Sequence, residues 1–194
     1  MSDSIRKATA ADLLAKFGED ARIEIIHGEF VPKAMPRVPH SRSYNYFVRA
    51  ISQRFDRKPG GKWPGGWFIC PELHVHYGET EVFCHDACGY RRDLHPELPN
   101  EWPCKIRPDW VCELLSPNHQ KHDLVDKWKV LQAAGVPHYW IVDPEEKLLR
   151  VHRLDAAGYT CILTASLGDV VRAEPFDAVE LRVSALFGDE DDDE

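Results

Sequence analysis

The segment from residue 107 to 132, RPDWVCELLSPNHQKHDLVDKWKVLQ, constrains the fold more than any other part of this chain. Residues 109–115 alternate in the manner of a β-strand, and the Pro-Asn pair at 117–118 then breaks the pattern. A helical period follows over about residues 121–134, and Gly135 is a C-cap signal that ends it. The sequence therefore predicts a strand that leads directly into a helix.

Glu113 places a charge inside this predicted strand, with hydrophobic residues on both sides. A buried carboxylate is costly unless it is paired with a cation or bound to a metal ion. Asp109 shares the strand face of Glu113, but four residues at about 3.3 Å each separate the two by about 13 Å. One metal ion cannot contact both, so a second ligand would have to come from another part of the chain. A salt-bridged structural acid is the alternative interpretation of Glu113.

The rest of the chain predicts further helices and strands. Helices are expected over 9–17, which a capping box opens, and over 41–55; strands are expected in the hairpin 21–33, in 67–86, in 137–154 and in 158–165. This order of elements predicts an α/β fold with a mixed central sheet flanked by helices.

The chain of 194 residues suits one compact domain, which we place at residues 1–188. The formal net charge is −8, and the six acids of residues 189–194 supply most of it. We predict that these six residues form an acidic disordered tail, and the near-neutral remainder neither requires nor excludes a polyanionic partner. No apolar run reaches the roughly 20 residues of a membrane span, and no signal-peptide core is present. We therefore expect a cytoplasmic protein without membrane contact.

Six cysteines follow no C-x-x-C spacing, which predicts free thiols in a reducing compartment. The cluster of His74, His76, Cys84, His85 and Cys88 raises the possibility of zinc, but its spacing matches no common structural zinc pattern. Histidines on a strand surface explain the cluster more simply. We expect neither a disulfide nor a zinc site at Cys84 and Cys88, and a zinc-dependent hydrolase is a minor alternative.

Three acids are stronger candidates for chemistry. Glu24 lies between two isoleucines in the first hairpin strand, Asp86 ends a predicted strand, and Glu113 lies in the central one. Carboxylates from neighbouring elements would form an oxygen-rich site of the kind that binds Mg²⁺ or Mn²⁺.

The sequence resembles the Uma family of restriction-endonuclease-like proteins, within the PD-(D/E)XK nuclease superfamily. The resemblance extends over nearly the whole chain; the segments that carry it include RIEIIHGEFV, PHSRSYNYFV, GGWFICPELHVHYG, PDWVCELLSP and GVPHYWIVDP. The last two segments, at their separation here, are the most specific part. The resemblance implies a restriction-endonuclease-like fold and a catalytic site formed by Glu24, Asp86, Glu113 and Lys127, with the three acids as ligands of Mg²⁺ or Mn²⁺.

Two positions depart from the family pattern. Where the family usually has Pro-Asp at the second acid, this chain has His85-Asp86, and we expect the change to be tolerated because proline mainly restrains the backbone. Leu115 holds the lysine position of the superfamily's E-x-K motif, and Lys127 matches the lysine that this family carries in the following helix. An ion pair between Lys127 and Asp123, four residues earlier, is the structural alternative.

The resemblance thus implies a metal-dependent endonuclease that hydrolyses phosphodiester bonds of nucleic acid, with DNA as the expected substrate. Nucleases of this superfamily often pair, so a homodimer is expected. The alternative is a nuclease-fold protein with weak or no activity that acts in binding or assembly. The assignment predicts that carboxylate oxygens of Asp86 and Glu113 lie within a few ångströms of a common point, with Lys127 nearby and Asp109 outside.

Overall fold

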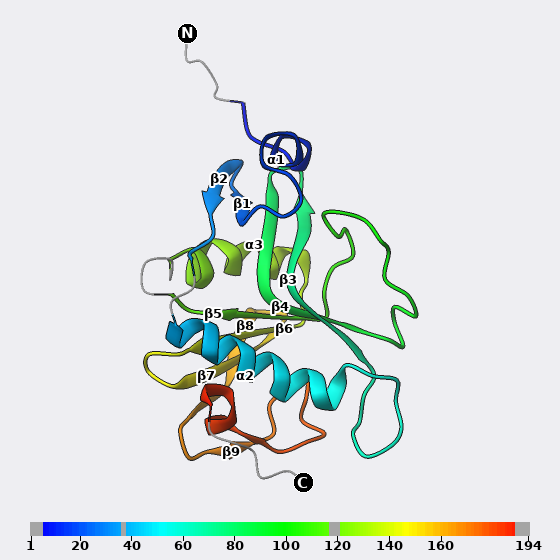
Figure 1. Cartoon of the computed structure of the whole chain (residues 1–194), viewed down its shortest axis with the longest axis vertical. Coiled ribbons are helices and arrows are strands. Elements are labelled where there is room, and N and C mark those ends of the chain that lie inside the picture. The colour runs from blue at the N-terminus through cyan, green and yellow to red at the C-terminus, as the bar shows by residue number, and fades with distance from the viewer. Residues whose placement is uncertain (1–5, 36–37, 117–120, 189–194) are drawn as a thin grey trace.

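The computed structural model describes residues 6–35, 38–116 and 121–188, so the predicted acidic tail lies outside the described residues. Figure 1 shows the chain. Its elements, in order, are α1 (Ala10–Phe17), β1 (Ile23–Ile26), β2 (Glu29–Pro32), α2 (Val38–Phe55), β3 (Trp67–Gly78), β4 (Glu81–Arg91), β5 (Trp110–Leu114), the π-helix η1 (His122–Asp126), α3 (Lys127–Ala134), β6 (His138–Asp143), β7 (Leu148–Asp155), β8 (Gly158–Ser166), β9 (Val170–Val171), β10 (Leu181–Arg182) and the 3₁₀-helix η2 (Val183–Phe187).

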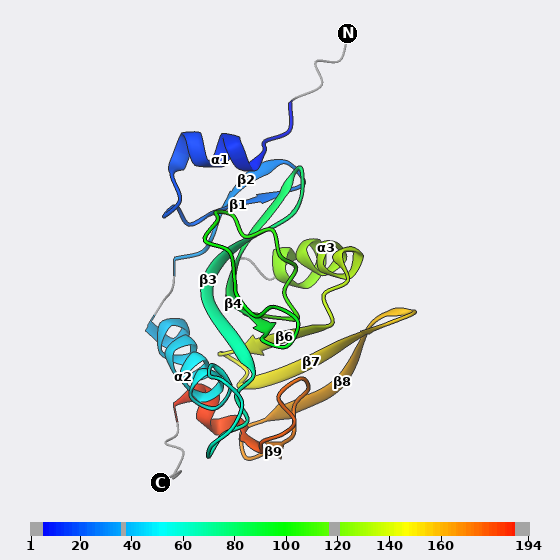
Figure 2. The same cartoon turned by 90° about the vertical axis from the view of Figure 1, so that its right-hand side faces the viewer.

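Eight strands form one sheet in the order β2-β1-β4-β5-β6-β7-β8, with β3 paired to β4. Strands β5 and β6 are parallel, and α3 lies between them in the chain, whereas the other neighbouring strands are antiparallel. Helices α2 and α3 lie on opposite faces of the sheet (Figures 1 and 2). The predicted α/β fold with a mixed central sheet flanked by helices is confirmed.

The central strand β5 has both of its faces packed. Trp110 and Leu114 belong to the core on the α2 side, whereas Val111 and Leu115 pack on the opposite side with Leu131 of α3. All of these side chains are buried. Because each fully buried large apolar side chain contributes about 1.5–3 kcal/mol, a shift of β5 by one residue would exchange the two faces at a high cost. The packing therefore fixes the face on which Glu113 lies.

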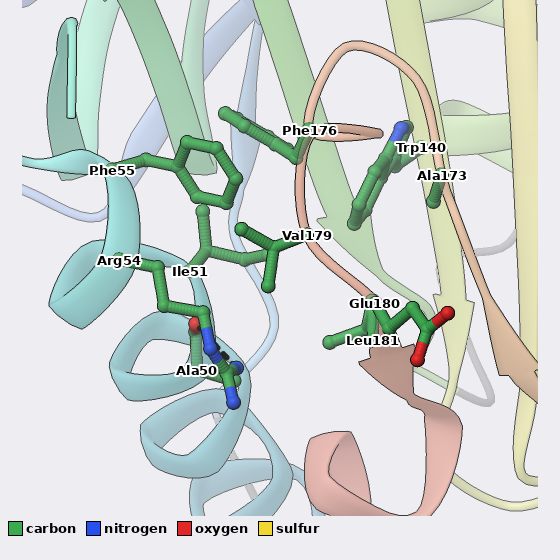
Figure 3. Close-up of a pocket in the computed structure, with 10 residues that line it drawn as sticks. All are labelled: Ala50, Ile51, Arg54, Phe55, Trp140, Ala173, Phe176, Val179, Glu180 and Leu181. Carbon is green, nitrogen blue, oxygen red and sulfur yellow. Dashed lines mark hydrogen bonds between the residues drawn. The ribbon is translucent and has the colours of Figure 1, made fainter. Parts of the chain in front are cut away.

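The C-terminal segment, residues 173–181, packs against α2 and the sheet. Figure 3 shows Ile51 and Phe55 of α2 near Phe176 and Val179 of this segment, with Trp140 of β6 beside them. The ring centroid of Phe176 lies 4.6 Å from that of Phe55 and 5.5 Å from that of Trp140. The C-terminal segment therefore shares the core that α2 forms with the sheet.

Two differences from the sequence predictions bear on the site. Strand β4 continues to Arg91 instead of ending at Asp86, because the residues after Asp86 pair with β3 on one side and with β5 on the other. The predicted helix over 121–134 begins as the π-helix η1 before α3 follows. Single π-turns of this kind often occur at functional sites.

No helix of the described residues has the length and apolar character needed to cross a membrane. The longest helix, α2, has 18 residues and carries Arg42, Arg49 and Arg54.

Candidate active site

The candidate site lies where β4 exchanges one neighbouring strand for another. Strand β4 pairs with β1 at Val82 and with β5 from Ala87 to Gly89. Because β3 pairs along the other edge of β4, both of these contacts are made on one edge. Between them, residues 83–86 have no strand partner on that edge among the described parts of the chain. The sheet thus forks at these residues, and their backbone groups are open to side chains.

Three carboxylates bond the backbone at this fork. Glu24 Oε1 accepts a hydrogen bond from the Cys84 N–H at 2.8 Å, and Asp86 Oδ2 accepts one from the Leu114 N–H at 2.7 Å. Glu113 Oε2 lies 3.5 Å from the Asp86 backbone nitrogen, which donates to it. The three acids are only 1–3% exposed. Backbone donors therefore orient each carboxylate and offset part of the cost of burying it.

Lys127 provides a buried cation for three acids. Its Nζ lies 2.9 Å from Glu24 Oε1, 3.1 Å from Glu113 Oε1 and 3.1 Å from Asp123 Oδ1. Burial alone would lower the pKa of Lys127, but the adjacent carboxylates outweigh it and raise the pKa well above its ordinary value. The ion pair with Asp123 is present, as the structural alternative requires, and the same ammonium also contacts Glu24 and Glu113, two of the three candidate catalytic acids.

Asp123 is a fourth acid of the site, which the sequence indicated only as a helix partner of Lys127. Burial raises the pKa of Asp123 to about 7, against the opposing effect of the ammonium of Lys127. The ammonium is 3.1 Å away, but it is shared with Glu24 and Glu113, whose negative charges raise the pKa of Asp123 further. Asp123 is therefore the acid that takes up a proton near neutral pH.

Lys33 is the second cation, and it was not among the residues predicted from the sequence. Its Nζ lies 2.8 Å from Asp86 Oδ1 and 3.8 Å from Glu113 Oε2. Burial would lower the pKa of Lys33, but these two carboxylates raise it. A signal was available in the hairpin register, which pairs Glu24 with Val31. Because strand side chains alternate, the residue two positions after Val31 points to the same side as Glu24.

His85 holds one oxygen of Glu113. Its Nδ1 lies 2.6 Å from Glu113 Oε1, and its Nε2 lies 2.7 Å from the Tyr77 hydroxyl. Burial lowers the pKa of His85, so the ring is neutral, donates its Nδ1–H to Glu113 and accepts the O–H of Tyr77. Burial would raise the pKa of Glu113, but Lys127, Lys33 and His85 together lower it. The histidine that stands where the family usually has proline thus helps to keep Glu113 ionised.

Asp86 and Glu113 lie close together, as predicted from the sequence. The evidence is that Lys33 Nζ lies within 4 Å of a carboxylate oxygen of each. Asp109 lies outside this group. Its Oδ2 accepts the backbone N–H of Arg91 at 2.8 Å, and Arg107 is 3.8 Å from its Oδ1, at the other end of β5. The prediction that Asp109 is not a member of the acid cluster is confirmed in its geometry.

The residues fit a hard divalent cation. The donors are carboxylate oxygens, which Mg²⁺ and Mn²⁺ prefer. Four carboxylates share two ammonium groups, so these six side chains carry a net charge of −2 (four negative against two positive) when all the acids are ionised. The ammonium of Lys33 stands at the cation position between Asp86 and Glu113. No set of three metal-binding side chains is preassembled in the described parts of the chain.

A small polar cavity of about 30 Å³ opens at these groups. Its lining consists of the acids and lysines of the site with a few neighbours, namely Glu24, Lys33, Ala34, His40, Asp86, Glu113, Leu114, Ser116, His122, Asp123 and Lys127. A space of this size is enough for a water molecule or a small ion.

Two histidines of the possible zinc cluster have other partners. His74 Nε2 lies 3.1 Å from the Ile23 carbonyl oxygen, and His85 bonds Glu113 as described above. All six cysteines are free thiols, and Cys84 and Cys88 lie four residues apart along β4. At about 3.3 Å per residue, these two sulfurs cannot meet.

A family model described as "Uma2: Putative restriction endonuclease" matches residues 10–184. Among solved structures, the crystal structure of "a putative nuclease belonging to DUF820" from Anabaena variabilis ATCC 29413 is similar, with a TM-score of 0.71 and 21% sequence identity. The match covers 92% of this chain and 97% of that chain. No curated protein matches this sequence. At this identity the structural likeness establishes the fold.

Proposed function

The chain belongs to the Uma2 restriction-endonuclease family, and on this premise we propose that it is a metal-dependent endonuclease that hydrolyses phosphodiester bonds of DNA. The observation that carries the proposal is the convergence of Asp86 and Glu113 on one cation position at the fork of the sheet. Glu24 and Lys127 complete the proposed catalytic group, since Lys127 contacts both Glu24 and Glu113.

Asp86 and Glu113 would hold Mg²⁺ or Mn²⁺, with Glu24 as the third acid. When bound, the ion supplies Lewis acidity towards a phosphoryl oxygen and lowers the pKa of a water molecule. The protein fixes one oxygen of each acid. Asp86 Oδ2 is bonded to a backbone N–H of β5, and Glu113 Oε1 is bonded to His85 and Lys127. The other oxygen of each acid is thereby directed to one place, which is the preorganisation that a catalytic site requires.

Lys127 is proposed as the lysine of the catalytic group. Its ammonium keeps Glu113 ionised and adds positive charge beside the position where a phosphate would gain negative charge during hydrolysis. The side chain of Lys127 is only 2% exposed, so we place its ammonium on the buried side of the carboxylates, where it is shielded from solvent. Its positive charge and its hold on Glu24 and Glu113 are therefore the two contributions that we assign to it.

A homodimer is part of the proposal, and strand β8 is the surface that supports it. β8 is the last strand of the sheet, and its sequence, GYTCILTAS, contains no charged residue and no proline. Within the described parts of the chain, the backbone of residues 158–165 makes no backbone–backbone hydrogen bond to a loop. An uncharged edge strand can pair with another strand, and two antiparallel copies of β8 would be self-complementary about a two-fold axis outside the register shift between Cys161 and Leu163.

The test is a cleavage assay on double-stranded DNA, single-stranded DNA and RNA in Mg²⁺, in Mn²⁺ and in chelator. We expect DNA to be cut only with a divalent ion, and Glu113→Gln to remove the activity. Lys105→Met is the control, because Lys105 lies in an exposed ion pair with Glu101. Cleavage of RNA alone would contradict the DNA assignment, and cleavage by the Glu113→Gln variant would contradict the site.

A further inference from the structure

Lys33 stands where the proposed function places a metal ion. Asp86 Oδ2 is already bonded to a backbone N–H. Glu113 Oε1 is already bonded to His85 and Lys127. The other two oxygens, Asp86 Oδ1 and Glu113 Oε2, lie 2.8 and 3.8 Å from Lys33 Nζ, and Glu113 Oε2 also accepts the long 3.5 Å bond from the Asp86 backbone N–H. The ammonium therefore neutralises the same two oxygens through which these acids would bind a divalent ion.

A metal ion and this ammonium exclude each other. Metal–oxygen distances for Mg²⁺ are about 2.0–2.1 Å, and Nζ is 2.8 Å from Asp86 Oδ1, so an ion bound to that oxygen would lie within about 5 Å of Nζ. Two cations at such a separation also repel strongly, because at 4 Å the interaction is about 4 kcal/mol even in a surface-like dielectric. Lys33 would have to leave before an ion is bound there.

Of the two lysines, Lys33 is the one with fewer ties to the site. Its ammonium contacts two carboxylates and donates to the carbonyl oxygen of Cys84, and 10% of its side chain is exposed. Lys127 contacts three carboxylates and only 2% of its side chain is exposed. Lys33 follows β2 in the chain and lines the cavity with its side chain 10% exposed, so its four-carbon stem can turn towards solvent while Lys127 stays in place.

We propose that Lys33 is an internal competitor for the metal ion. In the absence of metal, its ammonium holds Asp86 and Glu113 together; metal binding displaces it from that position. The inference rests on the proposed function, because it concerns the same pair of acids. The ammonium of Lys33 lowers the metal affinity of the site, since every ion must replace an existing ion pair. Activity therefore depends on the concentration of divalent metal.

The test measures Mn²⁺ binding by calorimetry in the whole chain, without nucleic acid. We expect Lys33→Met to bind Mn²⁺ about tenfold or more tightly than the wild type, a change of about 1.4 kcal/mol or more. Lys33→Arg keeps the charge and should keep the weaker affinity. Lys105→Met changes the net charge equally at a distant exposed position, and we expect it to leave the affinity unchanged.

Thermal unfolding provides a second measurement that needs no catalysis. In chelator, Lys33→Met should melt at a lower temperature than the wild type, because Asp86 and Glu113 lose their shared cation. Added Mn²⁺ should then raise the melting temperature of the variant by more than it raises that of the wild type. If Lys33→Met does not fold in chelator, Lys33→Gln, which retains a polar end group, takes its place in both measurements.

The outcomes separate the two proposals. Equal Mn²⁺ affinity in the wild type and in Lys33→Met would overturn the role of Lys33 and leave the metal site intact. Weaker binding in Lys33→Met would also overturn the competition and would identify Lys33 as a support of the site. Failure of both proteins to bind Mn²⁺ would contradict the metal site itself, and the inference on Lys33 would fall with it.

Discussion

Replacing Lys127 with methionine should destabilise the fold strongly. The substitution keeps most of the volume of the stem but leaves Glu24, Glu113 and Asp123 without the ammonium that lies 2.9–3.1 Å from each of them. All three acids are at least nine-tenths buried. Removing one partner of a buried ion pair costs about 3–5 kcal/mol. For a chain of this length, each 1 kcal/mol lowers the melting temperature by about 2–4 °C, so a decrease of about 6–20 °C is expected.

The size of this loss should depend on pH. In the wild type the pKa of Glu113 is lowered, so its ionised form stabilises the fold above the unfolded-state pKa, and this contribution is lost as the pH falls. In Lys127→Met, burial without the ammonium raises the pKa of Glu113 and Asp123, so the variant loses stability as the pH rises above the unfolded-state value of about 4. The difference between variant and wild type should therefore be larger at pH 8 than at pH 5.

Urea unfolding and calorimetry in chelator, at pH 5 and at pH 8, measure both effects. Lys105→Met is the matched control, because it removes the same charge from an exposed pair whose lysine side chain is 66% exposed. We expect that control to change the stability by less than about 1 kcal/mol. Unfolding of Lys127→Met at the same denaturant concentration as Lys105→Met would refute the view that Lys127 holds the buried acids together.

Three further predictions follow from the packing. Asp86→Asn should abolish Mn²⁺ binding in calorimetry with the fold intact. Asp109→Asn should lower the free energy of unfolding by about 1–3 kcal/mol and leave Mn²⁺ binding unchanged. The reverse pattern would show that the wrong aspartate has been assigned. Phe176→Ala should cost about 3–5 kcal/mol in urea unfolding, because its ring packs against Phe55 and other core aromatics, and an unchanged midpoint would contradict that packing. Thr164→Lys, which places a charge on β8, should convert a dimer into a monomer in light scattering, and an unchanged mass would rule out β8 as the interface.

Local sequence patterns predicted most of the fold because they depend on neighbouring residues. The Thr9–Asp12 capping box opens α1, with both of its reciprocal bonds present. Gly135 ends α3 in the left-handed conformation, with φ 77° and ψ 30°. The alternation of β5 predicted which of its residues share a face, and the two faces pack separately. Each of these features is settled within a few residues of chain, so the sequence alone was sufficient.

The fork of the sheet could not be predicted in this way. It depends on where β4 stops pairing with β1 and starts pairing with β5, and that register is set by contacts between segments far apart in the chain. The π-turn that precedes Lys127 was missed for a similar reason, since its residues also fit an ordinary helical period. Lys33 was missed because a single lysine after a short edge strand looks like a solvent-exposed residue until the hairpin register is applied. Glu24, Asp86 and Glu113 were selected as candidates because a carboxylate among hydrophobic residues needs a partner.

The most direct test of the metal site is anomalous diffraction from crystals of the wild-type protein grown with Mn²⁺. We predict one strong peak about 2 Å from both Asp86 Oδ1 and Glu113 Oε2, with Lys33 Nζ moved away from its present position between them and Lys127 still in contact with Glu113. No peak at this pair of acids, with Lys33 still bound to Asp86, or a peak on the histidines and cysteines of β3 and β4, would contradict the assignment.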